Sequence, residues 1–191
     1  MSYRSYITDV LVCGSRPLQT SDRSYLLLTR DAGMIYATAK SVREERSKQR
    51  FALQEFSLAR ATLIHGRLGW KIAGVEPGGN LFLTARNRAE RALVCSLVML
   101  VRRTMHGEEA HPQVYDDLTT CLAADNQWDI NDRELVMTLR LLYHLGYIAS
   151  TGLLTPLLDA KLGNNLGVRF SAETRAAAQA AITRALAESH L

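Results

Sequence analysis

The sequence has little of what marks metal sites, disulfide-rich proteins and membrane proteins. Its three cysteines, Cys13, Cys95 and Cys121, stand apart, with no CxxC pair and no histidine at ligand spacing. This excludes the usual zinc and disulfide frameworks. No apolar run is long enough to cross a bilayer, and the N-terminus lacks the apolar segment of a signal peptide. We therefore expect a cytoplasmic protein with no metal site and no membrane partner.

Catalytic motifs are missing as well. Gly78-Gly79 lacks the Lys and Ser/Thr that would follow in a phosphate-binding loop. The five histidines are scattered, and the sequence places no acidic or cysteine partner beside them. No motif joins a nucleophile, a base and an orienting group. We expect no enzyme activity, no catalytic residue and no cofactor.

Positive charge is concentrated in the first part of the chain. Residues 1–80 carry 12 Lys and Arg against 7 Asp and Glu, whereas residues 81–191 carry 11 against 12. The net charge of +4 therefore hides a basic N-terminal part and a nearly neutral remainder. This asymmetry favours a module that binds a polyanion, joined to a second domain.

Strand signals fill the first eighty residues. Five β-rich runs are expected, at 6–13, 24–29, 34–40, 56–64 and 70–75. Gly33 can take the positive φ of a tight turn after the second run, and Gly66 with Gly69 marks the turn before the last. Five strands in this length predict a five-stranded Greek-key barrel of the oligonucleotide-binding (OB) type.

The strand-like pattern ends at Glu76-Pro77-Gly78-Gly79-Asn80, where proline and paired glycines predict a domain boundary. From about residue 85 the apolar period is helical, as in Leu93, Leu97 and Val101. The predicted fold is α+β with two domains: a DNA-binding OB barrel over 1–80 and an all-helical domain over 81–191 that supports it and binds partners.

A basic segment joins the third and fourth predicted strands. It contains only two acidic residues, Glu44 and Glu45. A lone charge run is more often a solvated loop. Loops between barrel strands, however, line binding grooves, and cations there neutralise phosphates without exact geometry. Together with two cations near the last strand, they are the candidate DNA contacts: Lys40, Arg43, Arg46, Lys48, Arg50, Arg67 and Lys71.

Two further groups of side chains have open interpretations. Tyr25, Tyr36 and Trp70 either stack on bases or fill the barrel core, and Trp70 beside Lys71 is the best placed to stack. In the helical part, four arginines either rim an apolar groove for an acidic peptide or are ordinary exposed cations. These candidate partner-binding residues are Arg102, Arg103, Arg133 and Arg140.

A series of short segments spans about residues 5–150. The segments are Ser21-Asp22-Arg23, Leu28-Thr29-Arg30, Gly33, Ala39-Lys40, Ala52-Leu53-Gln54 with Phe56, Arg88-Ala89, Pro112, Leu141-Leu142 and His144-Leu145-Gly146-Tyr147. In these segments and in their order, the chain resembles the RecO family of bacterial recombination mediators. Three departures are visible. Ser41 stands where the family usually has Gly, there is no Cys-rich zinc insertion, and the region after Tyr147 is short.

The resemblance implies a mediator that is not an enzyme. Its implied properties are binding to single- and double-stranded DNA, strand annealing, and work with RecR in loading RecA onto strands coated by single-stranded-DNA-binding protein (SSB), whose acidic C-terminal tail is an expected partner. Two alternatives stay open. One is an adaptor of the same fold that has lost DNA binding, and the other, with no motif behind it, is a small nucleic-acid-processing enzyme.

Overall fold

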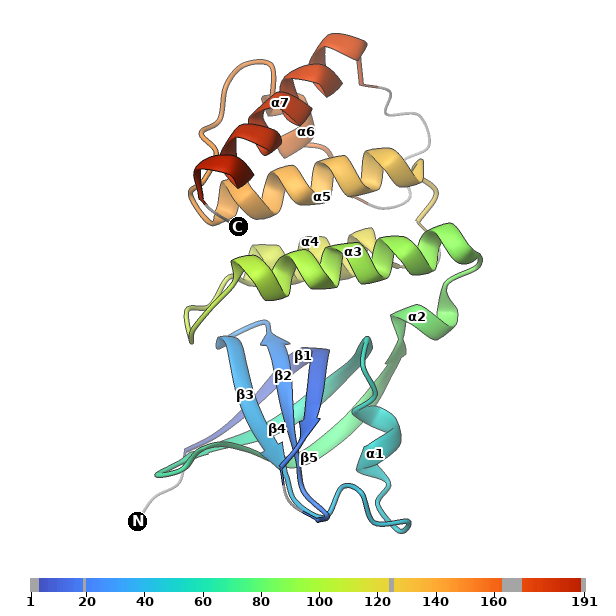
Figure 1. Ribbon diagram of the computed structural model, residues 1–191, viewed down its shortest axis with the longest axis vertical. Coiled ribbons are helices and arrows are strands. Elements are labelled where there is room, and N and C mark those ends of the chain that lie inside the picture. Colours follow the sequence, from blue (N-terminus) through green and yellow to red (C-terminus); the bar gives the residue numbers. More distant parts are fainter. Residues whose placement is uncertain (1–3, 19, 124–125, 163–169, 190–191) are drawn as a thin grey trace. The chain divides into compact units, whose positions relative to one another are not determined.

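The computed structural model describes residues 4–18, 20–123, 126–162 and 170–189 (Figure 1). The chain divides into two compact units. The barrel unit comprises Met1–Ala85 and His106–Pro112, and the helical unit comprises Arg86–Met105 and Gln113–Leu191. The barrel unit thus extends beyond residue 80 and takes in a second, later segment of the chain.

Five strands close into a barrel in the order β1-β2-β3-β5-β4. Neighbouring strands are antiparallel except β3 and β5, which run parallel. This is the topology of an OB barrel, and it confirms the expected fold class. The strands are β1 (Arg4–Pro17), β2 (Arg23–Thr29), β3 (Gly33–Ala39), β4 (Ser57–Gly66) and β5 (Gly69–Asn80).

The barrel interior is filled by the inward side chains of alternate strand positions, including Leu27, Ile35 and Leu63. The connection from β3 to β4 closes one end of it. Val42 and Leu53, both nearly inaccessible to solvent, belong to the same core. Leu53 follows directly on the short helix α1 (Gln49–Ala52). The connection is therefore anchored by its own apolar residues.

The segment Glu76–Asn80 does not interrupt the strand, which corrects the interpretation of its proline and glycines as a break. It continues β5 and pairs with β4, with Glu76 opposite Arg60 and Asn80 opposite Ser57. The register shifts at Gly78, where a Cβ would lie 3.1 Å from the carbonyl oxygen of Leu58. The glycine thus allows a bulge and a close backbone approach within the sheet, rather than a break between domains.

The segment 106–112 packs on the turn between β2 and β3. The backbone N–H of Met34 donates to the carbonyl oxygen of Gly107 at 2.9 Å. The indole Nε1 of Trp70 donates to the Glu108 carboxylate, also at 2.9 Å. Gly33 has φ +69°, and Thr29 Oγ1 closes the turn by donating to its carbonyl oxygen at 3.0 Å. The expected turn glycine is thus confirmed.

The helical unit is built on α5, which packs against both α3 and α7. Its core includes Leu139 and Leu142 of α5 with Ile182 of α7. Asn87 caps α3, and Ser171 caps α7. Its helices are α3 (Arg88–Thr104), α4 (Pro112–Cys121), α5 (Ile130–His144), α6 (Thr155–Leu158) and α7 (Ala172–Glu188). A further short helix, α2 (Leu81–Thr84), follows β5 and belongs to the barrel unit.

Candidate nucleic-acid interface

The outer face of β1, β2, β3 and β5 forms a continuous surface, because neighbouring residues of the four strands lie in one row. Arg16 pairs with Ser24, Ser24 with Thr38, and Thr38 with Lys71. Lys71 lies between Trp70 and Ile72, which both point into the core, so its side chain points outward. Cations of β1 and β5 therefore stand on two sides of β3.

The basic segment is held against the barrel by its backbone. The N–H of Ser41 donates to Asp22 Oδ1 at 2.9 Å, and the N–H of Arg43 donates to the carbonyl oxygen of Ser21 at 3.1 Å. With Val42 buried between these two bonds, the start of the segment is fixed beside the β1–β2 connection. In OB barrels this connection borders the ligand-binding face.

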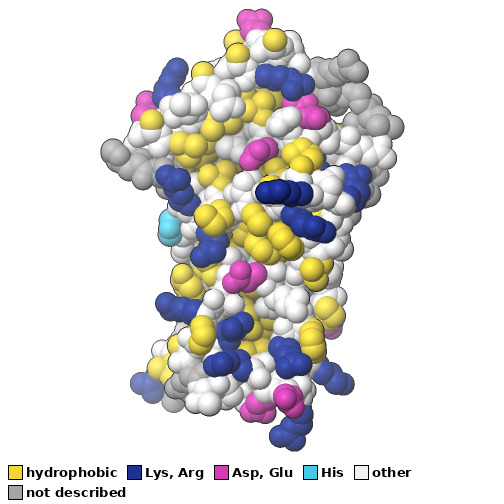
Figure 2. Space-filling model, turned by 45° about the vertical axis from the view of Figure 1, so that its right-hand side comes forward, with side chains coloured by type: hydrophobic (Ala, Val, Ile, Leu, Met, Phe, Trp, Pro, Cys, Tyr) yellow, Lys and Arg dark blue, Asp and Glu magenta, His cyan; other side chains and the backbone are white. Residues whose placement is uncertain are grey.

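The seven predicted DNA contacts all belong to the barrel unit. Lys71 is half-buried at its strand position, and the others are exposed: Lys40, Arg43, Arg46, Lys48 and Arg50 on the β3–β4 connection and Arg67 in the β4–β5 turn. Figure 2 shows Lys and Arg side chains spread over the barrel part of one face, with acidic side chains beside them at its lower end. The structure therefore groups five of the seven on one connection, with Arg67 and Lys71 at or after the next turn.

Of the three aromatic candidates, only Tyr36 is open to solvent. Tyr25 is 2% exposed in the barrel core, where burial raises the pKa of its hydroxyl. Trp70 is 8% exposed, packs edge-on against Tyr6 and donates its indole N–H to the Glu108 carboxylate. Tyr36 is 58% exposed on β3. The expectation that Trp70 is the best placed to stack was wrong, because its strand position faces inward.

The four predicted partner-binding arginines fall into two classes. Arg102 and Arg103 are exposed in the last turn of α3. Arg133 and Arg140 are buried on α5. Arg140 pairs with Asp117 at 2.9 Å and donates to the carbonyl oxygens of Leu157 and Ala160, so it ties α5 to α4 and α6. Neither buried arginine is accessible to a partner, and the predicted groove rim is reduced to Arg102 and Arg103.

Arg133 belongs to an ionic cluster with Glu90, which is also buried, and Arg86, which is exposed. Its Nε donates to the carbonyl oxygen of Cys121 at 2.8 Å, and its Nη1 lies 3.6 Å from Glu90 Oε1. Glu90 also accepts from the backbone N–H and the guanidinium of Arg86. The hydrogen bonds from Arg86, aided by the charge of Arg133, hold the pKa of the Glu90 carboxyl below its usual value. This cluster is structural and joins α3 to α5.

Ser41, one of the three departures from the family pattern, adopts φ +50°. Only glycine takes this conformation without strain, and other residues lose about 1–2 kcal/mol. We predict that Ser41→Gly is neutral or stabilises the barrel by up to about 1 kcal/mol, since greater freedom of the unfolded chain offsets part of the relief. Ser41→Val should destabilise it, because a β-branched side chain tolerates this region poorly. Urea unfolding measures both.

The matched control for Ser41→Val is Ser47→Val in the same connection. Ser47 is not among the residues with positive φ, so the added methyl groups should cost little there. If Ser41→Val, Ser47→Val and the wild type unfold at the same urea concentration, the left-handed conformation of Ser41 is contradicted.

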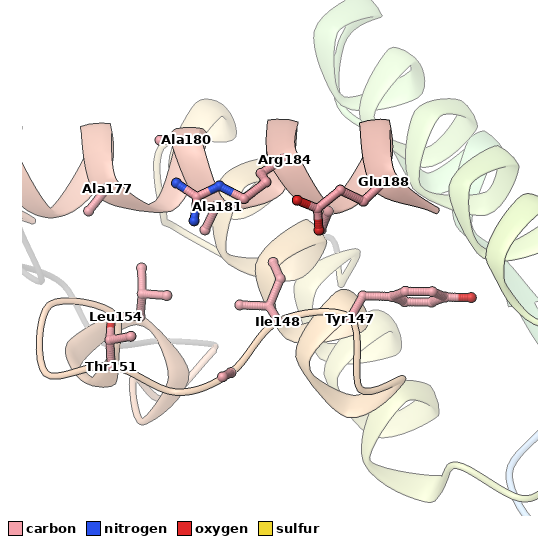
Figure 3. Close-up of a pocket in the computed structure, with 11 residues that line it drawn as sticks. Tyr147, Ile148, Thr151, Leu154, Ala177, Ala180, Ala181, Arg184 and Glu188 are labelled. Atoms are coloured by element: carbon pink, nitrogen blue, oxygen red, sulfur yellow. The ribbon is translucent and has the colours of Figure 1, made fainter. Parts of the chain in front are cut away.

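The helical unit contains a cavity of about 500 Å³ between α7 and residues 147–154. In Figure 3, Ile148 and Leu154 point from this segment toward α7, which presents Ala177, Ala181 and Arg184. None of the four predicted partner-binding arginines lines it. The small side chains of α7 leave room for an apolar group, beside one cation, Arg184, and one carboxylate, Glu188.

In the part of the chain that the structure describes, no group of three or more His, Cys, Asp and Glu side chains is arranged to hold a metal ion. Among the helices of the same residues, none combines the length and apolarity needed to span a membrane.

Comparison with known proteins shows similarity to DNA repair proteins. No family model matches the chain. It is 29% identical over 143 residues to the DNA repair protein RecO of Desulfitobacterium hafniense strain DSM 10664 / DCB-2, and equally to RecO of strain Y51. The aligned region is 74% of this chain but 52% of each relative, so the chain spans about half of their length. The chain is thus similar to RecO proteins, and the resemblance predicted from its residues is confirmed.

Proposed function

We propose that the chain is a DNA repair and recombination mediator that binds single- and double-stranded DNA and catalyses no reaction. Two observations support this. The relatives it matches are DNA repair proteins by name. The barrel has OB topology, with a basic connection fixed beside the β1–β2 connection. The second observation carries the proposal, because in OB barrels the β1–β2 connection borders the face that binds nucleic acid.

Binding would act mainly on phosphates. The cations of the β3–β4 connection are exposed on long side chains, which suits charge neutralisation better than recognition of a base edge. Binding of this kind has little sequence preference and weakens as salt rises, because counterions are released on association. Two strands on one basic surface would also repel each other less, which favours annealing.

The partner contacts belong to the same proposal. RecR, and through it RecA, and the acidic C-terminal tail of SSB are the partners that the resemblance implies. On the helical unit, Arg102 and Arg103 remain available to an acidic segment. The cavity beside α7 offers a recess lined by Ile148, Leu154 and alanines of α7, with both Arg184 and Glu188 at its wall. A titration of the protein with an SSB-tail peptide tests this part separately from DNA binding.

Fluorescence titration with a labelled single strand over a salt series tests DNA binding. We expect the logarithm of the affinity to fall linearly with the logarithm of the salt concentration. Replacing Arg43, Arg46 and Lys48 together by Ala should weaken binding to all sequences alike. If all three contact phosphates, the slope should decrease in magnitude by about 2, since each contact on a single strand contributes about 0.7.

A matched variant controls for net charge. Arg60, Arg88 and Lys161 are exposed and lie outside the predicted DNA-contact set. Their joint replacement by Ala removes the same three charges and should leave the slope unchanged. An equal loss in both variants would mean that net charge, not the β3–β4 connection, governs binding. A wild-type protein that binds no strand at any salt would point to the adaptor alternative.

A further inference from the structure

One exposed aromatic side chain on the barrel is not explained by packing. Tyr36 lies at the middle of β3, between Ile35 and Ala37, which both point into the core. Its side chain is 58% exposed, even though Cζ of Arg16 lies 5.2 Å from the centroid of its ring. Beyond its contact with Arg16, the ring is thus left open on the outer face of β3.

The register gives the ring an apolar neighbour on one side. Tyr36 pairs with Leu26 of β2, and Leu26 pairs with Gly14 of β1. Leu26 lies between the core residues Tyr25 and Leu27, so it points outward beside Tyr36. Gly14 adds no side chain to the row. On this side the ring therefore has an apolar neighbour and then a position without a side chain, which leaves space for a stacked base.

Cations lie close to the ring in the adjoining row. Thr38, two residues along β3, pairs with Ser24 and with Lys71, and Ser24 pairs with Arg16. The β4–β5 turn is also near, since Trp70 pairs with Ala37 and Arg67 lies three residues before Trp70. A base on Tyr36 would therefore have its own phosphates within reach of cations on either side of β3.

We propose that Tyr36, held under Arg16, is a stacking platform for an unpaired base, and that it makes the barrel prefer single-stranded over double-stranded nucleic acid. This inference rests on the proposed function and adds the feature that distinguishes the two ligands. Phosphates alone give little discrimination, because both ligands carry them. A base in a duplex is already stacked on both faces, whereas an unpaired base offers its face to the ring.

The test uses three fluorescent probes at one moderate salt concentration: a thymidine oligomer, the same oligomer without bases, and a duplex of the same length. The wild type should bind the thymidine oligomer more tightly than the abasic one. Tyr36→Ala should weaken binding to the thymidine oligomer by about 5- to 150-fold and leave the other two affinities unchanged. Tyr36→Phe, which keeps the ring, should bind like the wild type.

Tyr143→Ala is the matched control, because Tyr143 is a 38% exposed tyrosine on α5 of the helical unit. It should bind all three probes like the wild type. The inference is overturned if Tyr36→Ala binds all three like the wild type, or weakens all three equally. If the wild type binds in a salt-dependent manner and Tyr36→Ala binds every probe equally well, only this inference is contradicted. If the wild type binds no probe, the proposed function is contradicted too.

Discussion

Gly33→Ala should destabilise the barrel unit by about 2–5 kcal/mol. Gly33 has φ +69°, which costs an alanine about 1–2 kcal/mol. A Cβ there would lie 2.4 Å from the carbonyl oxygen of Glu109 and 2.7 Å from that of Gly107. Both obstacles are backbone atoms, and the bond from Met34 holds Gly107 in place. Relieving such a clash adds about 1–3 kcal/mol.

Gly69→Ala separates the two contributions. Gly69 also has positive φ, +92°, but nothing lies within 4 Å of the position of its Cβ. Gly69→Ala should lower the free energy of unfolding only by the conformational cost of positive φ, about 1–2 kcal/mol. Urea unfolding followed by tryptophan fluorescence measures both variants. A Trp128→Phe background leaves Trp70, in the barrel core, as the sole tryptophan. Equal losses at Gly33 and Gly69 would contradict the contact with segment 106–112.

Glu90→Ala should destabilise the helical unit by about 3–5 kcal/mol. The substitution leaves Arg133, 2% exposed, as a buried charge whose nearest carboxylate is gone. In a Trp70→Phe background, the fluorescence of Trp128 reports on the core of this unit. The control is Glu134→Ala on α5, where an exposed carboxylate accepts a hydrogen bond from Ser96 Oγ at 2.8 Å. We expect that loss to stay below about 1 kcal/mol.

A double variant tests whether the cost is that of an uncompensated charge. Replacing both partners, as Glu90→Leu with Arg133→Met, removes the charge as well as its partner. It should be less destabilised than the sum of the two single variants. If the losses simply add, the pair at 3.6 Å is not energetically coupled.

The same cluster should make the stability of the helical unit depend on pH in the acidic range. Because the folded-state pKa of Glu90 lies below the value of 4.5 of the free group, its ionised form stabilises the fold above that value. This stability is lost as pH falls through the lower, folded-state pKa. Glu90→Ala should therefore flatten the acid limb of stability against pH. An unchanged acid limb would contradict the ionised, hydrogen-bonded state of Glu90.

Much of the fold could be predicted because its signals are local. The alternation in 34–40 and the turn glycine at Gly33 defined the β2–β3 hairpin before any tertiary contact was known. Gly78 shows the limit of such reasoning. Beside Pro77 it looked like a break, because its purpose depends on the backbone of Leu58, twenty residues earlier. Pairing over that separation leaves no local pattern.

The candidate site shows a different limit, since two usable signals were overlooked. Tyr36 and Trp70 differ by strand alternation: Tyr36 lies between inward residues, and Trp70 is two positions from the inward Ile72. Arg133 and Arg140 lie seven residues apart, two helical turns, in one stripe with the buried Val136 and Met137. Their charge suggested a surface, but their spacing indicated the core.

The barrel unit consists of two segments of the chain, which affects its folding during synthesis and the choice of fragments for expression. A ribosome delivers residues in order, so all five strands emerge before Gly107 and Glu108, which Met34 and Trp70 bind. The barrel can close early, but its last contacts wait until α3 has also emerged. A fragment cut after Asn80 would lack them, with the Trp70 N–H unmatched and Gly33 uncovered. Expressed alone, such a piece is a poorer guide to the barrel than the full chain.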